Sequence, residues 1–152
     1  MTSYFFLRYL HILATSIWFG ATLLLSGDIR RSLAAGNSHG KLLIDRVNRT
    51  VAITSLTGIL TLLSGVAMVL QSGGFANLPF RLLFGFCLTI LLLALGILGM
   101  RPLWARMRQL ITNGHDDAEL RSLSKAITTL SGISHLLWVT ILGLMVFKNA
   151  LT

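Results

Sequence analysis

The sequence contains little charge. Only 12% of its 152 residues are Asp, Glu, Lys or Arg, about half of the share that is usual in a soluble domain. In contrast, 54% of the residues are hydrophobic and the mean hydropathy is +0.77. These values exclude an ordinary water-soluble domain. The net charge is +8. In so apolar a chain, this charge does not indicate nucleic-acid binding.

Several chemical motifs are missing as well. Cys87 is the only cysteine, so the chain cannot form an intramolecular disulfide. The sequence has no Gly-rich phosphate loop, no Ser-His-Asp pattern and no Cys-x-x-Cys motif. Its long apolar segments contain no carboxylate, which argues against a proton-coupled carrier and against an intramembrane acid–base hydrolase.

What the sequence does contain is four apolar segments, at residues 4–25, 51–70, 82–100 and 126–147. Each is long enough to span a bilayer, because about 20 residues rising 1.5 Å each cover the hydrocarbon core. The connections are short, so neighbouring helices must be antiparallel. The sequence therefore predicts an all-α integral membrane protein, in which residues 1–152 form a single up-down four-helix bundle in contact with lipid.

The basic residues are divided unequally between the two sides of the predicted membrane. One side has only Arg8, Arg81 and Lys148. The first and third connections, with the adjacent helix ends, contain the other ten: Arg30, Arg31, Lys41, Arg46, Arg49, Arg101, Arg106, Arg108, Arg121 and Lys125. Because loops rich in Lys and Arg remain in the cytoplasm, we expect a bacterial inner-membrane protein with both termini outside.

The helical pattern continues past the lipid into both basic connections. We expect turns near residues 36–40 and 113–114, so that both hairpins extend beyond the membrane by about two turns. Pro102 predicts a kink near the inner end of the third helix. Asp116, followed three residues later by Glu119, resembles a helix N-terminus with a capping box.

Two histidines, His11 and His135, lie within the predicted spans. A histidine in a membrane helix usually has a partner or a function. Counting residues places His11 roughly 6–9 Å below the outer surface and His135 roughly 18 Å below it. The difference of about 10 Å argues against one haem held by both imidazoles.

Three interpretations of these histidines compete. One or both could bind haem b inside the bundle, with Arg8 and Arg81 contacting the propionates and Trp18 on the same helix face as His11. They could instead form a copper site, but the methionines that would serve as further ligands are not clustered. In the third interpretation both are packing residues that form hydrogen bonds with neighbouring helices.

Four parts of the sequence resemble known membrane proteins. Tyr9–Ala14 and Ile17–Ala21 resemble the first helix of a group that contains the copper-resistance D family, the small membrane protoporphyrinogen oxidases and an uncharacterised family of predicted integral membrane proteins. Trp104–Arg108 resembles the basic end of the third helix of the uncharacterised family. Leu144–Lys148 is similar to its Met-Val-Phe-Lys-Pro ending, with Asn149 in place of Pro.

The resemblance implies a function as well as a helix count. In the oxidase branch a first-helix histidine and a third-helix lysine serve haem or porphyrin handling; His11 matches the first, and Arg81 occupies the position of the lysine. The extra Met and His ligands of the copper branch are missing. We expect a haem b- or porphyrin-binding redox protein. The alternatives are an accessory subunit of a larger membrane complex or of a homo-oligomer, and a copper transport or delivery protein.

Overall fold

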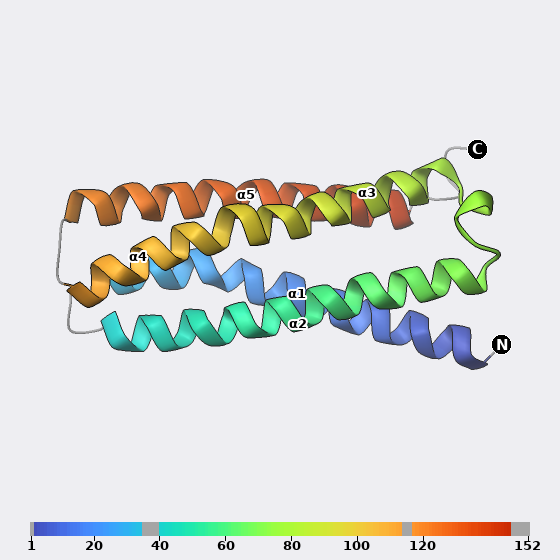
Figure 1. Cartoon of the computed structure of the whole chain (residues 1–152), viewed down its shortest axis with the longest axis horizontal. Coiled ribbons are helices and arrows are strands. Elements are labelled where there is room, and N and C mark those ends of the chain that lie inside the picture. The colour runs from blue at the N-terminus through green and yellow to red at the C-terminus, as the bar shows by residue number, and fades with distance from the viewer. Residues whose placement is uncertain (1, 35–39, 114–116, 147–152) are drawn as a thin grey trace.

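The computed structural model describes residues 2–34, 40–113 and 117–146, which are almost entirely helical and include no strand. Five α-helices follow one another along the chain (Figure 1): α1 Thr2–Ala34, α2 Gly40–Gln71, α3 Phe80–Ala94, α4 Arg101–Asn113 and α5 Asp117–Val146. Between them lie a short 3-10 helix, η2 (Phe75–Asn77), and a π-helical segment, η3 (Leu95–Met100).

The helices form an antiparallel four-helix bundle, as the sequence predicts. Helices α3, η3 and α4 join into one continuous rod, so four rods result, each long and apolar enough to cross a membrane. Helix α1 packs against α2 along its length, and α5 packs against α1 and α3. The start of α1 and the end of α5 lie at the same end of the molecule (Figure 1).

Both hairpins on the basic side extend well beyond the apolar segments, which confirms the predicted continuation of the helices. Helix α1 continues nine residues past Leu25 to Ala34, and α2 begins eleven residues before Val51 at Gly40. The predicted helix start at Asp116 lies outside the described residues. Glu119, the other residue of that motif, forms an ion pair with Arg106 of α4 at 2.8 Å.

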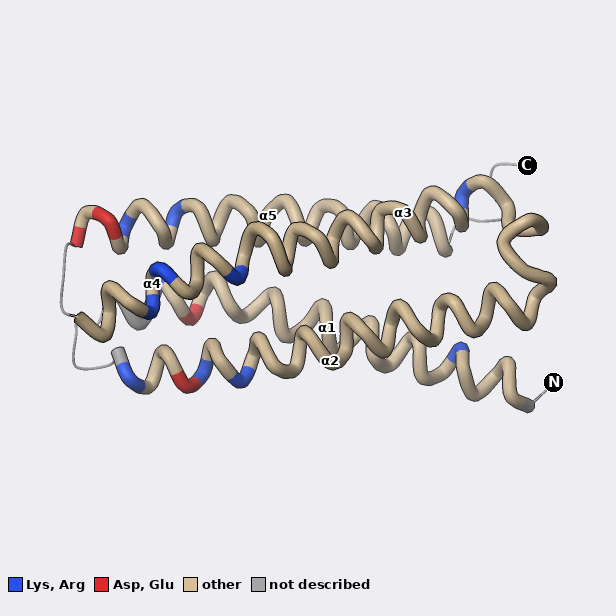
Figure 2. The backbone as a smooth tube through the Cα atoms, in the orientation of Figure 1, with Lys and Arg blue, Asp and Glu red and all other residues tan. Residues whose placement is uncertain are grey.

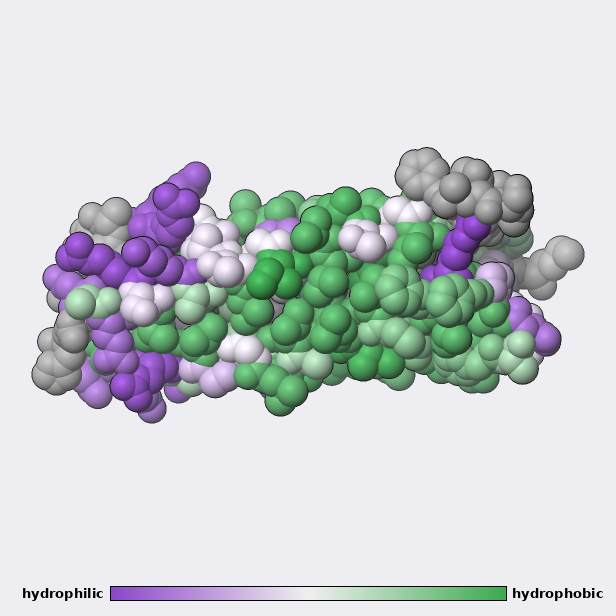
Figure 3. All heavy atoms as spheres, turned by 90° about the horizontal axis from the view of Figure 1, so that it is seen from above, coloured by the Kyte–Doolittle hydropathy of each residue, from purple (hydrophilic) through white to green (hydrophobic). Residues whose placement is uncertain are grey.

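The charges collect at one end of this bundle (Figure 2). Most Arg and Lys residues lie at the end where α1 meets α2 and α4 meets α5, whereas Arg8 and Arg81 are the basic residues described near the opposite end. The space-filling view in Figure 3 shows the same division, with a hydrophilic end and a hydrophobic surface over most of the remaining length. We call the hydrophilic end the basic end. The opposite end, where α1 begins and α5 ends, is the terminal end.

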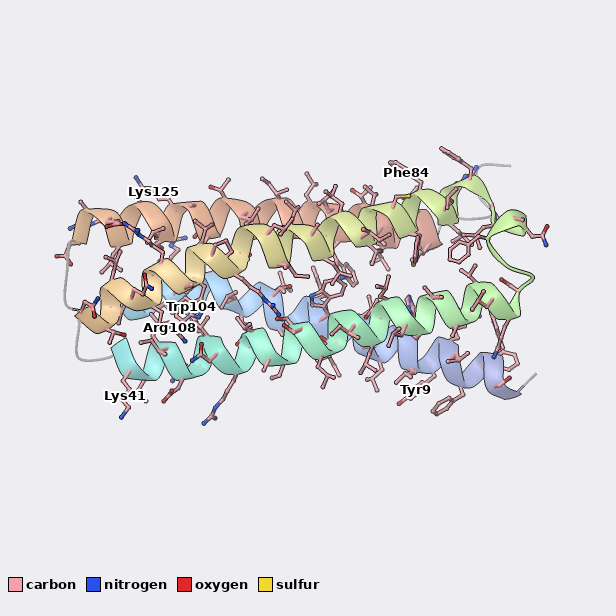
Figure 4. The ribbon with its side chains drawn as sticks, viewed as in Figure 1. Tyr9, Lys41, Phe84, Trp104, Arg108 and Lys125 are labelled. Atoms are coloured by element: carbon pink, nitrogen blue, oxygen red, sulfur yellow. The ribbon has the colours of Figure 1, made fainter. Side chains whose placement is uncertain are left out.

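Two hydrophobic clusters lie inside the bundle, one toward each end. The larger, at the basic end, contains eight buried residues, among them Ile29, Leu43 and Met107. The smaller consists of Trp18, Leu92 and Ile141, with half-buried neighbours packed around it. Many large side chains on the outside are exposed, and Tyr9 and Phe84 point away from the bundle (Figure 4), as expected for surfaces in contact with lipid.

Candidate functional site

A cavity of about 160 Å³ lies within the bundle between the two clusters. All four rods contribute to its wall, with Trp18 from α1, Thr54 from α2, Leu92 from α3 and Ser131 from α5 among the lining residues. The wall is mostly apolar, and polar groups enter it at only a few points. This composition is typical of small-molecule sites, in which a few polar groups orient a mainly apolar ligand.

The cavity opens sideways, between α2 and the η3–α4 segment. Among the residues that line it, only Ile59 on α2 and Gly96, Ile97 and Arg101 on η3 and α4 are exposed. The lining residues of α1 and α5 are buried or half-buried. Ile59 and Ile97 are each about half exposed (54% and 51%) on the apolar outer surface, so the mouth opens toward the lipid.

Local sequence explains why the third rod is irregular beside the cavity. Pro102 has no backbone N–H, so the carbonyl four residues earlier, at Leu98, loses its helical partner. The backbone N–H of Arg101 bonds to the carbonyl of Gly96, five residues back, as in a π-helix. The structure thus has a π-helical segment on the N-terminal side of Pro102, near the position where the sequence predicts a kink. Such segments occur often at functional sites.

His135 lines the cavity, and its ring interacts with the backbone carbonyl of Thr22 on α1. Its Nε2 is buried and, within the described part of the chain, has no hydrogen-bond partner. The ring packs edge-on against Phe19 of α1, with centroids 5.7 Å apart and planes at 87°. A buried imidazole nitrogen without a hydrogen-bond partner lowers the stability of the protein. A ligand group or a water molecule that bonds to it would remove this cost.

Ser131 lies one helical turn before His135 and also lines the cavity. Its side chain is buried, at 3% exposure, and among the residues described here its hydroxyl forms no hydrogen bond. The neighbouring Ser134, in contrast, donates to the backbone carbonyl of Leu130 at 2.9 Å. Because residues four apart share a helix face, Ser131 and His135 present two unused polar groups together.

Arg101 supplies a positive charge at the mouth of the cavity. Its Nη2 donates a hydrogen bond of 3.0 Å to the Ser55 hydroxyl, which connects α4 to α2 across the opening. A guanidinium carries five N–H donors, so this single bond leaves donors for a ligand. The sequence assigned Arg101 only to the basic side. Its position directly before Pro102, where the helix is irregular, could have marked it as a candidate.

All three tryptophans of the chain, Trp18, Trp104 and Trp138, line the cavity. Trp104 extends from α4 toward α2 (Figure 4) and donates a hydrogen bond of 3.2 Å from Nε1 to Oδ1 of Asn48. Trp138 stacks on Phe19 with centroids 4.2 Å apart. The tryptophan fluorescence of the protein therefore comes entirely from residues around this one cavity.

His11 occupies a different environment, the seam between α1 and α2. Its Nδ1 lies 3.1 Å from the Thr61 carbonyl and 3.0 Å from the Ser64 hydroxyl. Its ring lies so close to Gly65 that a methyl group added there would be 3.4 Å from Cε1. Since a carbonyl only accepts, Nδ1 carries the proton and Nε2 of a neutral ring presents its lone pair.

The structure therefore does not bring the two histidines together. His135 contacts Phe19, which lies eight residues after His11 on α1, or about 12 Å along the helix. Two histidines that bind the same haem iron would have to lie much closer together along the bundle than this distance. Trp18 and His135, in contrast, do line the same cavity.

Other predicted site residues lie away from the cavity. Arg8 is exposed on α1, and Arg81 is half-buried at the start of α3; neither lines the cavity wall. Of the methionines considered for copper, Met100 lines the cavity and Met145 packs against the smaller cluster. Within residues 2–34, 40–113 and 117–146, no three His, Cys, Asp or Glu side chains form a potential metal site.

Comparison of this chain with protein-family models, with curated proteins and with solved structures found no match.

Proposed function

We propose that this protein binds a ring-bearing, mostly apolar small molecule inside the membrane, in the cavity beside His135. The observation that carries the proposal is a mostly apolar cavity whose wall includes the buried Ser131 hydroxyl, which has no hydrogen-bond partner among the described residues. A polar atom left unpaired in such a place costs free energy in the empty protein. A ligand that forms a hydrogen bond with it recovers that cost.

The size of the cavity limits what can enter it. An apolar cavity of about 150 Å³ accommodates a benzene molecule, and this one measures about 160 Å³. A single substituted ring therefore fits, with any larger part of the ligand extending through the mouth. Trp18 and Trp138 offer aromatic surface on which such a ring can pack.

Binding of a single ring can be measured with 4-bromophenol, whose heavy atom quenches tryptophan fluorescence. Because every tryptophan lines the cavity, we expect saturable quenching in the detergent-purified protein. Ser131→Leu should abolish it by filling the cavity, whereas Ser16→Leu, on the exposed face of α1, should not. Linear quenching that is equal in the wild type and both variants would refute the proposal.

Haem b is a second candidate ligand, and a separate observation favours it. The hydrogen bond from His11 Nδ1 to the Thr61 carbonyl is the arrangement that orients metal-ligating histidines and fixes their tautomer. Haem b would supply one-electron redox chemistry, with His11 as a ligand and Arg8 and Arg81 as partners for its carboxylates. A whole porphyrin exceeds the cavity beside His135, so His11 is the histidine that we propose as the haem ligand.

The haem proposal is tested by oxidised and dithionite-reduced absorbance spectra, with metal analysis of the same sample. A stoichiometric haem b spectrum that His11→Ala removes and His135→Ala preserves would support it. Loss of the spectrum in His135→Ala but not in His11→Ala would refute His11 as the ligand. A protein without haem or copper would leave the small-molecule site of the cavity as the function to pursue.

We further propose that the basic end lies in the cytoplasm of a bacterial cell and both termini lie outside, as the positive-inside rule indicates. Ser72, in the loop after α2, and Ser122, at the basic end of α5, are both exposed. In a Cys87→Ser background, a membrane-impermeant maleimide should label Ser72→Cys in intact cells and Ser122→Cys only after lysis. The opposite pattern would invert the topology.

A further inference from the structure

The direction in which the Arg101 side chain points specifies the ligand of the cavity further, and this inference rests on the small-molecule site proposed above. Two contacts fix the register of α2 against the third rod. Trp104 donates a hydrogen bond to Asn48, and a methyl group added to Gly58 would lie 3.1 Å from Leu93. On the register between these contacts, the backbone of Arg101 is level with the start of the second apolar segment.

The Arg101 guanidinium lies deeper in the bundle than its own backbone. It bonds to the hydroxyl of Ser55, about four residues further toward the terminal end, or roughly 6 Å along the helix. An arginine at the edge of the hydrocarbon usually extends the other way, toward the headgroups and water. Within the described part of the chain Arg101 forms no ion pair. An unpaired positive charge at this depth is costly, and an anionic ligand would offset that cost.

Ser131 supplies a second hydrogen-bond donor at the level of this guanidinium. Helix α5 is aligned with the third rod at Gly99, where an added methyl group would lie 2.8 Å from a Leu130 methyl. On this register the Arg101 guanidinium and Ser131 lie within about two residues of each other, or roughly 3 Å along the bundle axis. Both residues line the cavity, and the Ser131 hydroxyl has no partner among the described residues.

These two donors and the wall beyond them suit a planar acid attached to a ring. A carboxylate accepts two parallel hydrogen bonds from a guanidinium, and its oxygens have lone pairs left for the Ser131 hydroxyl. The Trp18 ring lies beside Gly58, where a methyl group would be 3.4 Å from it. Gly58 is three residues beyond Ser55 along α2, or roughly 4–5 Å, so a ring joined to a carboxylate at Arg101 reaches the tryptophan.

We propose that the cavity binds an aromatic carboxylate with a single ring. The carboxylate bonds to Arg101 and Ser131, the ring packs against Trp18, and any further substituent extends through the mouth between Ile59 and Ile97. No Asp or Glu is among the described residues that line the cavity, whereas Arg101 carries a positive charge there. The site therefore favours an ionised acid over a neutral ring of the same shape.

The test compares 4-bromobenzoate with 4-bromobenzamide, a neutral compound of similar shape, by saturable quenching of tryptophan fluorescence in the detergent-purified protein. The wild type should bind 4-bromobenzoate more tightly, by about tenfold or more. Arg101→Gln should weaken 4-bromobenzoate binding by roughly ten- to a hundredfold, the loss expected for a hydrogen bond to a charged group, and 4-bromobenzamide binding by no more than about threefold.

Arg108→Gln is the matched control, because it removes the same charge from an exposed residue of α4 that does not line the cavity. It should leave the affinity for both compounds within about twofold of the wild type. Equal losses of 4-bromobenzoate binding in the two variants would mean that the positive charge acts from a distance, and the inference would be wrong. Retained 4-bromobenzamide binding in Arg101→Gln would show that the variant is folded.

The remaining outcomes separate this inference from the function on which it rests. If 4-bromophenol quenches saturably but the wild type binds 4-bromobenzoate no more tightly than 4-bromobenzamide, the cavity is a ring-binding site without a preference for acids. If no compound quenches saturably, both proposals fail. Competition with decanoate tests the ring itself. Displacement of 4-bromobenzoate by decanoate at lower concentration than by benzoate would replace the aromatic acid with an aliphatic one and overturn the inference.

Discussion

The two ends of the bundle are stabilised by different interactions. At the basic end, the buried residues Met107 and Leu120 each stand between charged neighbours in the sequence, as in a soluble helical protein. At the terminal end, the contacts between α1 and α2 are polar or involve small residues, as at His11 and Gly58. The difference arises because water surrounds the basic end and lipid surrounds the rest of the bundle.

In water, burying apolar side chains drives helices together. In lipid, apolar packing gains little over contact with acyl chains, so close approach at small residues and hydrogen bonds between helices become the important terms. The cavity lies where one mode of packing changes into the other, between the two hydrophobic clusters. Several small residues on its wall, such as Ser131 and Gly96, leave the space there unfilled.

The largest expected effect tests the water-driven core. Met107 is completely buried in the cluster at the basic end, so Met107→Ala should lower the free energy of unfolding by about 2–5 kcal/mol. Leu98, on the same rod but 76% exposed on the apolar surface, is the matched control, and Leu98→Ala should change little. Thermal or denaturant unfolding in detergent measures both. Equal losses in the two variants would contradict the distinction between the ends.

The next effect compares the two histidines. His11→Leu removes the hydrogen bonds to Thr61 and Ser64 and should cost about 1–2 kcal/mol. His135→Leu removes a buried nitrogen that has no partner among the described residues. In ligand-free protein it should therefore cost less than His11→Leu, because the polar interaction that is lost is the one with the Thr22 carbonyl. Unfolding curves that shift downward equally for both variants would show that His135 is satisfied in the empty protein.

Close packing at the terminal end is tested at Gly58. A methyl group there would lie 3.1 Å from Leu93 and 3.4 Å from the Trp18 ring. Gly58→Ala should therefore cost about 1 kcal/mol. Gly20→Ala has open space within 4 Å and should stabilise the helix by about 0.5–1 kcal/mol. The comparison fails if both substitutions shift the midpoint of thermal unfolding in the same direction.

The smallest effect concerns the ion pair between Arg106 and Glu119 at the basic end. The two side chains are 62% and 34% exposed, and exposed pairs contribute about 0–1 kcal/mol. Glu119→Gln should lower stability within that range in low salt, and the difference should shrink as salt screens the charges. A loss that is independent of salt would mean that Glu119 acts through packing rather than charge.

Particular residues show which features the sequence could predict. The apolar segments predicted four membrane-spanning rods in the correct order, because length and hydropathy alone decide whether a helix can cross a bilayer. Pro102 predicted a kink near the inner end of the third helix, since a missing N–H acts locally, and the structure has the π-helical segment η3 just before it. His135 and Trp18 were also identified as candidates, because a histidine within a membrane helix is unusual wherever it points.

Other features depend on contacts between distant parts of the chain. The sequence assigned Arg101 to the basic side, yet it lines the cavity, as does Ser131. Arg8 and Arg81 share a membrane side with His11, but neither lines the cavity beside His135. Spacing along one helix shows which residues share a face. It does not show which face meets another helix and which meets an empty space.

The sequence by itself determined the class of protein, the number of spans and the gathering of charge at one end, because these follow from local hydropathy and from residue order. Only the tertiary structure decided that Nδ1 of His11 would bond to α2 and that Nε2 of His135 would have no hydrogen-bond partner among the described residues. The reason is geometric. Both imidazoles have the same chemistry, and what distinguishes them is how closely the neighbouring helix approaches.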